Sequence, residues 1–247
     1  PMAQNIYDDA HFFDAYRALK RSRDGLDGAP EWPRLRAMLP DLKAARVLDL
    51  GCGFGWFCRF AREQGAAQIL GIDISEKMLG VARQMTTDPA INYRRADLDD
   101  LQLDHSAFDL VYASLVFHYL EHLDGVIAAI HRALRPGGHL VFSVEHPMFT
   151  APSQPEWIDT ANGKKAWPVN RYLDEGPRET NWLAQGVIKQ HRTFATYLNL
   201  LVPQGFQISQ IEGWGPSDAQ LAAMPTLAEE RDRPTFLLIA AQRSLRD

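Results

Sequence analysis

The sequence predicts an α/β protein built on a doubly wound, mostly parallel β-sheet. Short apolar runs typical of buried strands alternate with segments of helical spacing between residues 46 and 145. Such alternation indicates βαβ units, in which helices cover both faces of a parallel sheet. The 247 residues suit one domain with additions, and the 46% apolar and 23% charged content is that of an ordinary globular chain.

The first 45 residues are expected to form a helical cover. One face of a predicted helix is apolar and aromatic, formed by Phe12, Phe13, Tyr16 and Leu19. The stretch that follows, RSRDGLDGAPEWP, holds glycines and prolines and is predicted to be a loop. Residues 32–39 can form a short helix that stops at Pro40.

The central part of the chain, residues 46–145, carries the predicted core. Its strands are expected at residues 45–51, 67–73, 91–97, 108–113 and 139–145. Helices are expected between them at residues 54–64, 75–85 and 118–134. Gly65 is a C-cap signal for the first helix, and Ser75 is an N-cap signal for the second.

The remainder is predicted to be an inserted lid followed by two more strands. Residues 146–190 contain prolines and three tryptophans without a sustained period, and so long an irregular segment usually carries function. Thr193 caps a helix that ends near Gly205, and strands follow at 206–213 and 235–242. We expect a single domain over 1–247, divided into 1–45, 46–145, 146–190 and 191–247. We also expect a seven-stranded sheet whose last strand is antiparallel.

A glycine loop is the most informative motif. Gly51, Gly53 and Gly55 lie between the first strand and the first helix, where a doubly wound sheet binds nucleotide-like ligands. The dinucleotide pattern GxGxxG needs a glycine where Trp56 stands. Asp49 would repel a pyrophosphate but suits a cationic ligand. No Gly-Lys-Ser/Thr follows, which excludes a P-loop.

Aspartates stand at the ends of three successive predicted strands, at positions 49, 73 and 97. The carboxyl ends of parallel strands converge on one crevice, which is the ligand site of this architecture. Asp73 follows Asp49 by 24 residues, close to the spacing at which a carboxylate binds ribose hydroxyls. The sequence therefore predicts a binding site for a ribose-containing, partly cationic ligand.

Five ordered segments resemble the class I S-adenosylmethionine-dependent methyltransferases of the small-molecule type. They are DLGCGFG (49–55), GIDIS (71–75), ADL (96–98), FDLVYAS (108–114) and LRPGGHL (134–140). The resemblance implies a Rossmann-like fold, S-adenosylmethionine as cofactor and a small-molecule methyl acceptor. It covers residues 46–145 in order and at family spacing.

The resemblance also implies roles for single residues. Main chain at Gly51 and Gly53 is expected against the methionine part and ribose, with Asp49 favouring the cationic end. Asp73 is expected to bind both ribose hydroxyls, and Asp97 the adenine amino group. The remaining expected cofactor contacts are Ile74, Met78, Leu98 and Ser114, together with Tyr16 and Arg21 from the N-terminal cover, Arg21 being suited to the methionine carboxylate.

A general base for the acceptor is a separate question. His118 follows the fourth strand at the mouth of the crevice and is the candidate catalytic residue, although capping or packing would also explain it. His146 and His191 are weaker candidates for the same role. No HxxxH or similar spacing indicates a metal site. Trp157, Trp167 and Trp182 could form the core of the lid or line an apolar substrate pocket.

The composition of the chain limits the classes of partner that we expect. With 26 basic and 31 acidic residues the formal charge is −5, which does not favour nucleic acid. No apolar run reaches the ~20 residues of a membrane span, and two cysteines, Cys52 and Cys58, suit a reducing cytoplasm. Two alternatives stay open, a non-catalytic S-adenosylmethionine-binding protein and a nicotinamide-dependent oxidoreductase. Neither the acceptor nor the oligomeric state is predicted.

Overall fold

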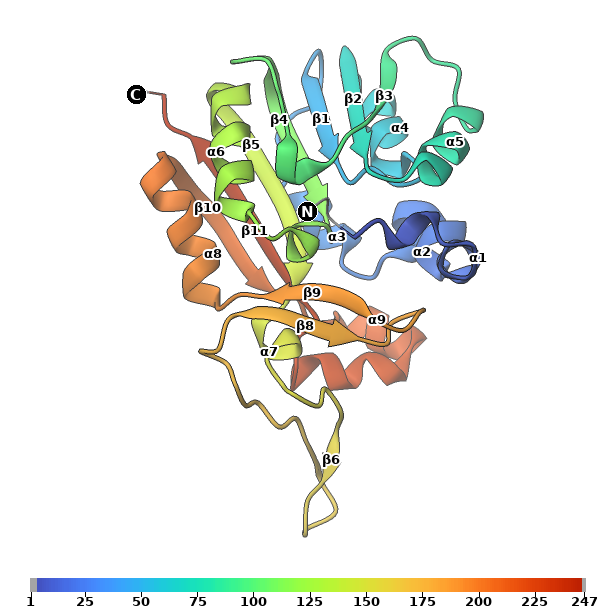
Figure 1. Cartoon of the computed structure of the whole chain (residues 1–247), viewed down its shortest axis with the longest axis vertical. Coiled ribbons are helices and arrows are strands. Elements are labelled where there is room, and N and C mark those ends of the chain that lie inside the picture. Colours follow the sequence, from blue (N-terminus) through green and yellow to red (C-terminus); the bar gives the residue numbers. More distant parts are fainter. Residues whose placement is uncertain (1–3, 246–247) are drawn as a thin grey trace.

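A seven-stranded sheet forms the centre of the molecule, which is described here by a computed structural model for residues 4–245 (Figure 1). The strand order is β10-β11-β5-β4-β1-β2-β3. The strands are β1 (Arg46–Leu50), β2 (Gln68–Asp73), β3 (Ile91–Arg95), β4 (Phe108–Ser114), β5 (Leu134–Glu145), β10 (Phe206–Gly213) and β11 (Phe236–Arg243). β1 to β5 pair in parallel, and β11 is antiparallel to both β5 and β10. The predicted mostly parallel sheet with an antiparallel last strand is confirmed.

Helices cover both faces of this sheet because side chains alternate along each strand. Leu48 and Leu50 of β1 lie in one apolar cluster with residues of α6 and α8, whereas Val47 lies in a second cluster with residues of α3, α4 and α5. The helices are α3 (Trp32–Ala37), α4 (Trp56–Glu63), α5 (Glu76–Gln84), α6 (Leu123–Ala133) and α8 (Phe194–Leu201). Ser75 caps α5 and Thr193 caps α8, as the sequence predicts.

The N-terminal cover differs from the prediction in one place. α1 (Ala10–Ala18) follows the short 3-10 turn Ile6–Asp8, but the predicted loop after it contains α2 (Lys20–Arg23) and a second 3-10 turn, Gly25–Gly28. Tertiary contacts fix these turns: the Trp56 indole donates to the Ser22 carbonyl at 3.3 Å and lies against Gly25. Glycine and proline are poor helix formers, so the composition of this stretch predicts a loop. Glycine is needed at position 25 because its φ is +65° and a Cβ there would collide with the Trp56 ring.

The predicted helix over 118–134 begins later than expected. Leu115 has a φ of +56°, and Phe117–Tyr119 form a separate 3-10 turn before α6 starts at Leu123. A left-handed residue cannot continue a right-handed helix, so the chain is redirected after β4. The redirection places the 117–119 turn at the carboxyl edge of the sheet.

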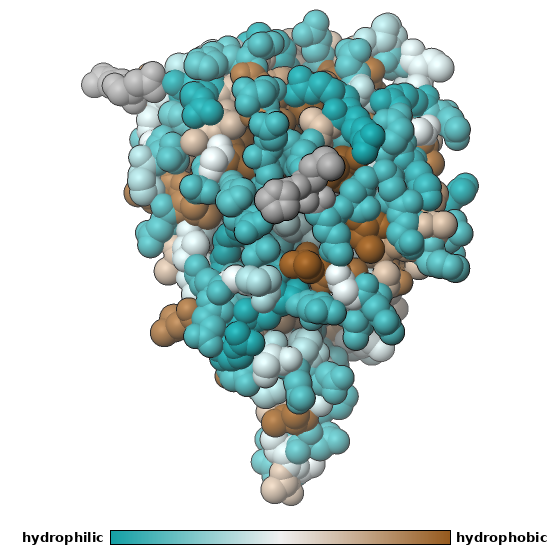
Figure 2. Space-filling model, in the orientation of Figure 1, coloured by the Kyte–Doolittle hydropathy of each residue, from teal (hydrophilic) through white to brown (hydrophobic). Residues whose placement is uncertain are grey.

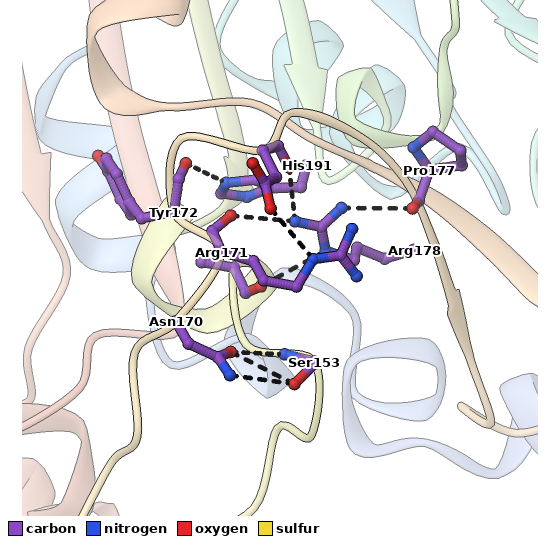
Figure 3. A network of polar contacts seen from close by, with 9 residues as sticks. Ser153, Asn170, Arg171, Tyr172, Pro177, Arg178 and His191 are labelled. Atoms are coloured by element: carbon purple, nitrogen blue, oxygen red, sulfur yellow. Dashed lines mark hydrogen bonds and ion pairs between the residues drawn. The ribbon is translucent and has the colours of Figure 1, made fainter.

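The lid contains ordered hairpins where the sequence shows no period. α7 (Pro147–Thr150) begins it; β6 (Ile158–Asp159) pairs with β7 (Lys165–Ala166), and β8 (Gly176–Thr180) pairs with β9 (Val187–His191). Figure 1 shows the β6 hairpin projecting away and β8 and β9 crossing below the sheet. Polar contacts hold the irregular part: Arg178 donates to the carbonyls of Arg171 and Asp174, and a His191 ring nitrogen lies 2.8 Å from the Tyr172 carbonyl (Figure 3).

The C-terminal part completes the sheet through a helical connection. Between β10 and β11 lie α9 (Asp218–Ala223) and the 3-10 turn Pro225–Arg231, in a stretch for which no helix is predicted. Over residues 4–245, no helix is both long and apolar enough to cross a bilayer. The face shown in Figure 2 is mostly hydrophilic, with apolar residues scattered over it.

Candidate active site

A cavity of about 480 Å³ opens at the carboxyl ends of the parallel strands. Every residue that the sequence proposes for cofactor binding lies on its wall: Tyr16, Arg21, Asp49, Gly51, Gly53, Asp73, Ile74, Met78, Asp97, Leu98 and Ser114. His118 lines the same cavity. The structure thus brings the predicted residues together, while their individual contacts with a cofactor stay predictions.

The glycine loop turns sharply between β1 and α4. Gly51 has a φ of +69°, and a Cβ there would lie 2.8 Å from the side chain of Val116. Gly53 has a φ of +51°, and a Cβ there would meet nothing within 4 Å. Gly53 therefore leaves its main chain open for the close approach of a ligand. Main-chain hydrogen bonds fix the loop to β2, because the amides of Gly51 and Cys52 donate to the Ile72 carbonyl at 2.8 and 3.0 Å.

Asp73 joins the glycine loop to the end of β2. Its carboxylate accepts from the Gly53 amide and the Ser75 amide, both at 2.9 Å. Burial raises the pKa of Asp73 to about 6, although these two amides oppose the shift. Ser75, rather than Asp73, caps α5 by accepting from the Met78 amide at 3.1 Å. Asp73 keeps further acceptor capacity beside these amides, as a carboxylate that binds ribose hydroxyls requires.

Asp49 is a buried acid to which the described part of the chain supplies no cation. It is 2% exposed, and its carboxylate accepts from the Cys58 thiol at 3.3 Å. Burial raises the pKa of Asp49 to about 7, and the nearby charge of Asp73 adds to the shift. A nearby positive charge stabilises a buried carboxylate whose pKa is raised. Asp49 therefore fits a cationic ligand group such as a sulfonium at this end of the cavity.

The wall near β3 is mainly apolar and would suit an adenine ring. Met78 and Leu98 are 1% and 5% exposed, and Ile74 joins them on the cavity wall. Asp97 accepts from the Asp99 amide at 3.0 Å, which orders the turn after β3. Its carboxylate is thereby held beside the apolar wall, which agrees with the predicted contact to the adenine amino group.

The N-terminal cover contributes Tyr16 and Arg21. Arg21 donates to both carboxylate oxygens of Glu31, at 2.8 and 3.1 Å, and its guanidinium lies 5.6 Å from the centre of the Phe236 ring. Glu31 is fully buried, so it balances the charge of Arg21 before any ligand binds. A role for Arg21 at the methionine carboxylate stays a prediction and would depend on its remaining N–H donors.

The three candidate histidines differ in whether they line the cavity and in the hydrogen bonds of their ring nitrogens. His118 is 1% exposed, and its Nδ1 accepts from the Glu145 amide at 3.3 Å. Burial lowers the pKa of His118 well below its usual value, and Lys189 and Arg192 add to the effect. An imidazole that accepts at Nδ1 carries its proton on Nε2, so the geometry favours a donor rather than a base. The catalytic assignment of His118 stays untested.

His146 and His191 do not line the cavity. His146 caps α7 by accepting from the Met148 amide at 3.1 Å. Both ring nitrogens of His191 are used inside the lid, toward Thr150 at 2.7 Å and toward the Tyr172 carbonyl (Figure 3). These contacts give both residues structural roles.

The cover and the lid meet over the cavity. Gln4 donates to the Gly186 carbonyl and accepts from the Ile188 amide, at 2.9 and 3.0 Å. Trp182 lies edge-on to Phe12 and Tyr16, with ring centres 5.6 and 6.4 Å apart. Trp182 lines the cavity, as one interpretation of the lid tryptophans expects.

Trp157 and Trp167 follow the other interpretation. They enclose the Arg233 guanidinium together with Phe149, at ring-centre distances of 4.6 to 5.6 Å. These contacts join the lid to the start of β11. The three tryptophans thus divide between the cavity and the lid core.

Several cavity residues were missed from the sequence, among them Tyr7, Glu31, Tyr119 and Glu145. Glu145 ends β5 in the same way that Asp73 ends β2, so the rule that found the aspartates would also have found it. Tyr7 and Glu31 have no such signal, because they reach the cavity through the fold of the cover. Across residues 4–245, no group of three or more His, Cys, Asp or Glu side chains could hold a metal ion.

Known proteins resemble both the motif region and the whole fold. Residues 48–142 match a family model described as a methyltransferase domain. An S-adenosylmethionine-dependent methyltransferase of Mesorhizobium loti is 56% identical, covers 89% of this chain and all of its own, and has a TM-score of 0.86. A Listeria monocytogenes protein described as the same kind of enzyme is 40% identical, covers 87% of this chain and 99% of its own, and has a TM-score of 0.79.

A more distant relative is a malonyl-[acyl-carrier protein] O-methyltransferase of Enterobacter lignolyticus. It is 34% identical over 151 residues, which are 61% of this chain and 54% of that enzyme. The match therefore spans only about half of that relative's length. Taken with the sheet topology and the glycine loop at the cavity, the full-length likenesses show that the chain is an enzyme of the class I S-adenosylmethionine-dependent methyltransferase family.

Proposed function

We propose that this methyltransferase acts on a small-molecule acceptor. The observation that supports this is the joint covering of the cavity by the N-terminal segment and the lid, through Gln4 and Trp182. Such a covered site favours an acceptor that can be enclosed with the cofactor. We further propose the cytoplasm as the location, because the two cysteines are unpaired.

The chain's own residues would act mainly by positioning. S-adenosylmethionine supplies an electrophilic methyl group on a sulfonium. Asp49 balances its positive charge, Asp73 holds the ribose hydroxyls, and Met78 with Leu98 receives the adenine. Holding the acceptor in line with the methyl group supplies much of the acceleration, since the reaction needs no covalent enzyme intermediate.

Methyl transfer from radiolabelled S-adenosylmethionine tests the proposal. Phenols, aliphatic alcohols, amines and carboxylic acids would be compared with malonyl-acyl carrier protein, the substrate class named for the partial relative. We expect at least one free small molecule to be methylated. Methylation of the carrier-bound substrate alone would overturn the proposal and place a carrier protein at the mouth of the cavity.

A further inference from the structure

We propose that Glu145 is the catalytic proton acceptor of an aromatic-walled acceptor subsite, which takes a planar molecule bearing a hydroxyl group. The proposal rests on the small-molecule function above and deepens it. It assigns a role to a carboxylate that the cofactor chemistry does not use. It also identifies the side of the cavity on which the acceptor lies.

The position of Glu145 is the first argument. It is the last residue of β5 and lines the cavity two residues beyond Ser143, whose neighbour across the strands is Ser114. β5 lies beside β4, on the side away from β1 and β2, which carry the glycine loop and Asp73. A ligand placed on the glycine loop would therefore leave Glu145 to a second molecule.

Aromatic side chains surround this part of the cavity. Tyr7, Tyr16, Tyr119, Trp182 and Phe236 all line the cavity. Lys189, the ion-pair partner of Glu145, lies 6.0 Å from the Tyr119 ring centre and 4.9 Å from that of Trp182, and Phe236 lies opposite Glu145 across the strands. The ring centres of Tyr7 and Tyr119 are 6.1 Å apart in an edge-to-face arrangement, and those of Tyr16 and Trp182 are 6.4 Å apart. Walls of this kind bind a flat, largely apolar molecule well and fix its orientation.

The hydrogen bonding of Glu145 is the second argument. Its Oε1 accepts from the Lys189 Nζ at 2.6 Å, and the two side chains are only 13% and 4% exposed. Its Oε2 is buried and has no hydrogen-bond partner among residues 4–245. A buried acceptor without a donor is costly, and a hydroxyl group on the acceptor molecule would satisfy it.

The surrounding charges suit proton acceptance. Burial raises the pKa of Glu145, whereas Lys189 and, more weakly, Arg21 lower it. Lys189 on β9 lies 4.9 Å from the Trp182 ring centre and does not line the cavity. It therefore pairs with the Glu145 carboxylate on the side away from the cavity. The neighbouring His118 and Tyr119 are held neutral, because burial lowers the pKa of His118 and raises that of Tyr119.

The step balances without another reactant. Glu145 Oε2 takes the proton of the acceptor hydroxyl as the hydroxyl oxygen forms a bond to the methyl carbon. The carbon–sulfur bond breaks, and its electron pair stays on sulfur, giving the neutral thioether. The proton remains on Glu145 and passes to solvent when the methylated product leaves.

Two variants and one control test this assignment. Glu145→Gln keeps the size and the contact to Lys189 but cannot accept the proton. Lys189→Met removes the charge that lowers the pKa of Glu145, so the rise of the rate with pH should move to higher pH. Glu212→Gln is the matched control, because Glu212 is on β10 and pairs with Arg34 outside the cavity. Binding of S-adenosylhomocysteine, measured by calorimetry, should stay within about 2-fold of wild type in Glu145→Gln and in the control.

The first readout needs no turnover. Protein labelled with ¹³C at glutamate carboxyls and loaded with S-adenosylhomocysteine would be titrated with phenol as the probe. We expect the Glu145 carboxyl resonance, assigned by its loss in Glu145→Gln, to move while that of Glu212 stays fixed. An unmoved Glu145 resonance, or a Glu145 that stays protonated up to pH 9, would overturn the assignment.

The second readout is kcat for hydroxyl acceptors. We expect Glu145→Gln to lower it by ~10²- to 10⁴-fold, the usual contribution of a general base, and to remove the rise of the wild-type rate with pH. Full activity in this variant would overturn the role of Glu145 and leave the small-molecule function standing. A moved resonance without methylation of any free small molecule would support the subsite and overturn the small-molecule function.

Discussion

The replacement Asp49→Asn separates the two effects that the buried carboxylate has on this enzyme. The amide has nearly the same shape and can still accept from the Cys58 thiol, but it carries no charge. Without cofactor, the residues from 4 to 245 place the unfavourable charge of Asp73 near this carboxylate and pair it with no cation. We therefore expect the variant to be more stable than wild type in the absence of cofactor, and to bind the cofactor less well.

The magnitude follows from the pKa of Asp49, which burial raises from 3.8 to about 7. At ~1.36 kcal/mol per pKa unit, ionised Asp49 costs the folded state about 4 kcal/mol. The buried amide N–H groups of the asparagine lack partners and cost ~1–3 kcal/mol, which leaves a net gain in the free energy of unfolding of about 1–3 kcal/mol. For a chain of this size, the melting temperature at pH 8 should rise by roughly 2–12 °C.

The sign of the pH dependence is a further check. Because the folded protein holds the Asp49 proton more tightly than the unfolded chain, stability falls as pH rises from about 4 to about 7. Asp49→Asn should remove its part of this fall, while Asp73 keeps its own. Scanning calorimetry of the cofactor-free protein at several pH values measures both.

Ligand binding completes the test. A cation close to a carboxylate shifts its pKa by ~1–3 units, so the variant should lose about 10-fold or more of its affinity for S-adenosylmethionine. Affinity for S-adenosylhomocysteine, which has no sulfonium charge, should change much less. An unchanged ratio of the two affinities, together with no gain in stability at pH 8, would refute this reasoning.

Three further predictions concern other parts of the site. Asp73→Ala should weaken S-adenosylhomocysteine binding by ~10²- to 10⁴-fold in calorimetry, since two charge-assisted hydrogen bonds are worth about 3–6 kcal/mol together; a loss below 10-fold would contradict the ribose role. Trp182→Ala, which removes contacts to Phe12 and Tyr16, should speed tryptic cleavage of the lid while S-adenosylhomocysteine still binds. Arg233→Ala should lower the free energy of unfolding by about 2 kcal/mol in urea titrations, because three aromatic rings lose the cation that they enclose; unchanged stability would show that these contacts are not stabilising.

The cavity residues at the glycine loop and at the strand ends could be predicted because their signals are local. Asp49, Gly51 and Gly53 lie within five residues of one another, Asp73 is the last residue of β2, and Asp97 stands just after β3. Parallel pairing then brings strand ends together whatever the loops do. Glu145 ends β5 in the same way, so the position of strand ends in the sequence points to it as well.

The part of the cavity wall that comes from the cover and the lid could not be predicted in this way. Tyr7, Glu31 and Trp182 come from the cover and the lid, and they meet through contacts such as Gln4 with Ile188 that leave no period in the sequence. The predicted loop after residue 20 and the predicted irregular lid both contain short ordered elements. Elements of two to five residues have too few side chains to show a pattern.

By itself, then, the sequence determined the sheet, the glycine loop and the acids that line the cavity, because hydrophobic periodicity and strand ends are properties of consecutive residues. Only the tertiary structure decided which histidines are used up by hydrogen bonds, which tryptophan faces the cavity, and which carboxylate oxygen is left without a donor. Those outcomes depend on burial and on partners far apart in the chain, such as Lys189 beside Glu145.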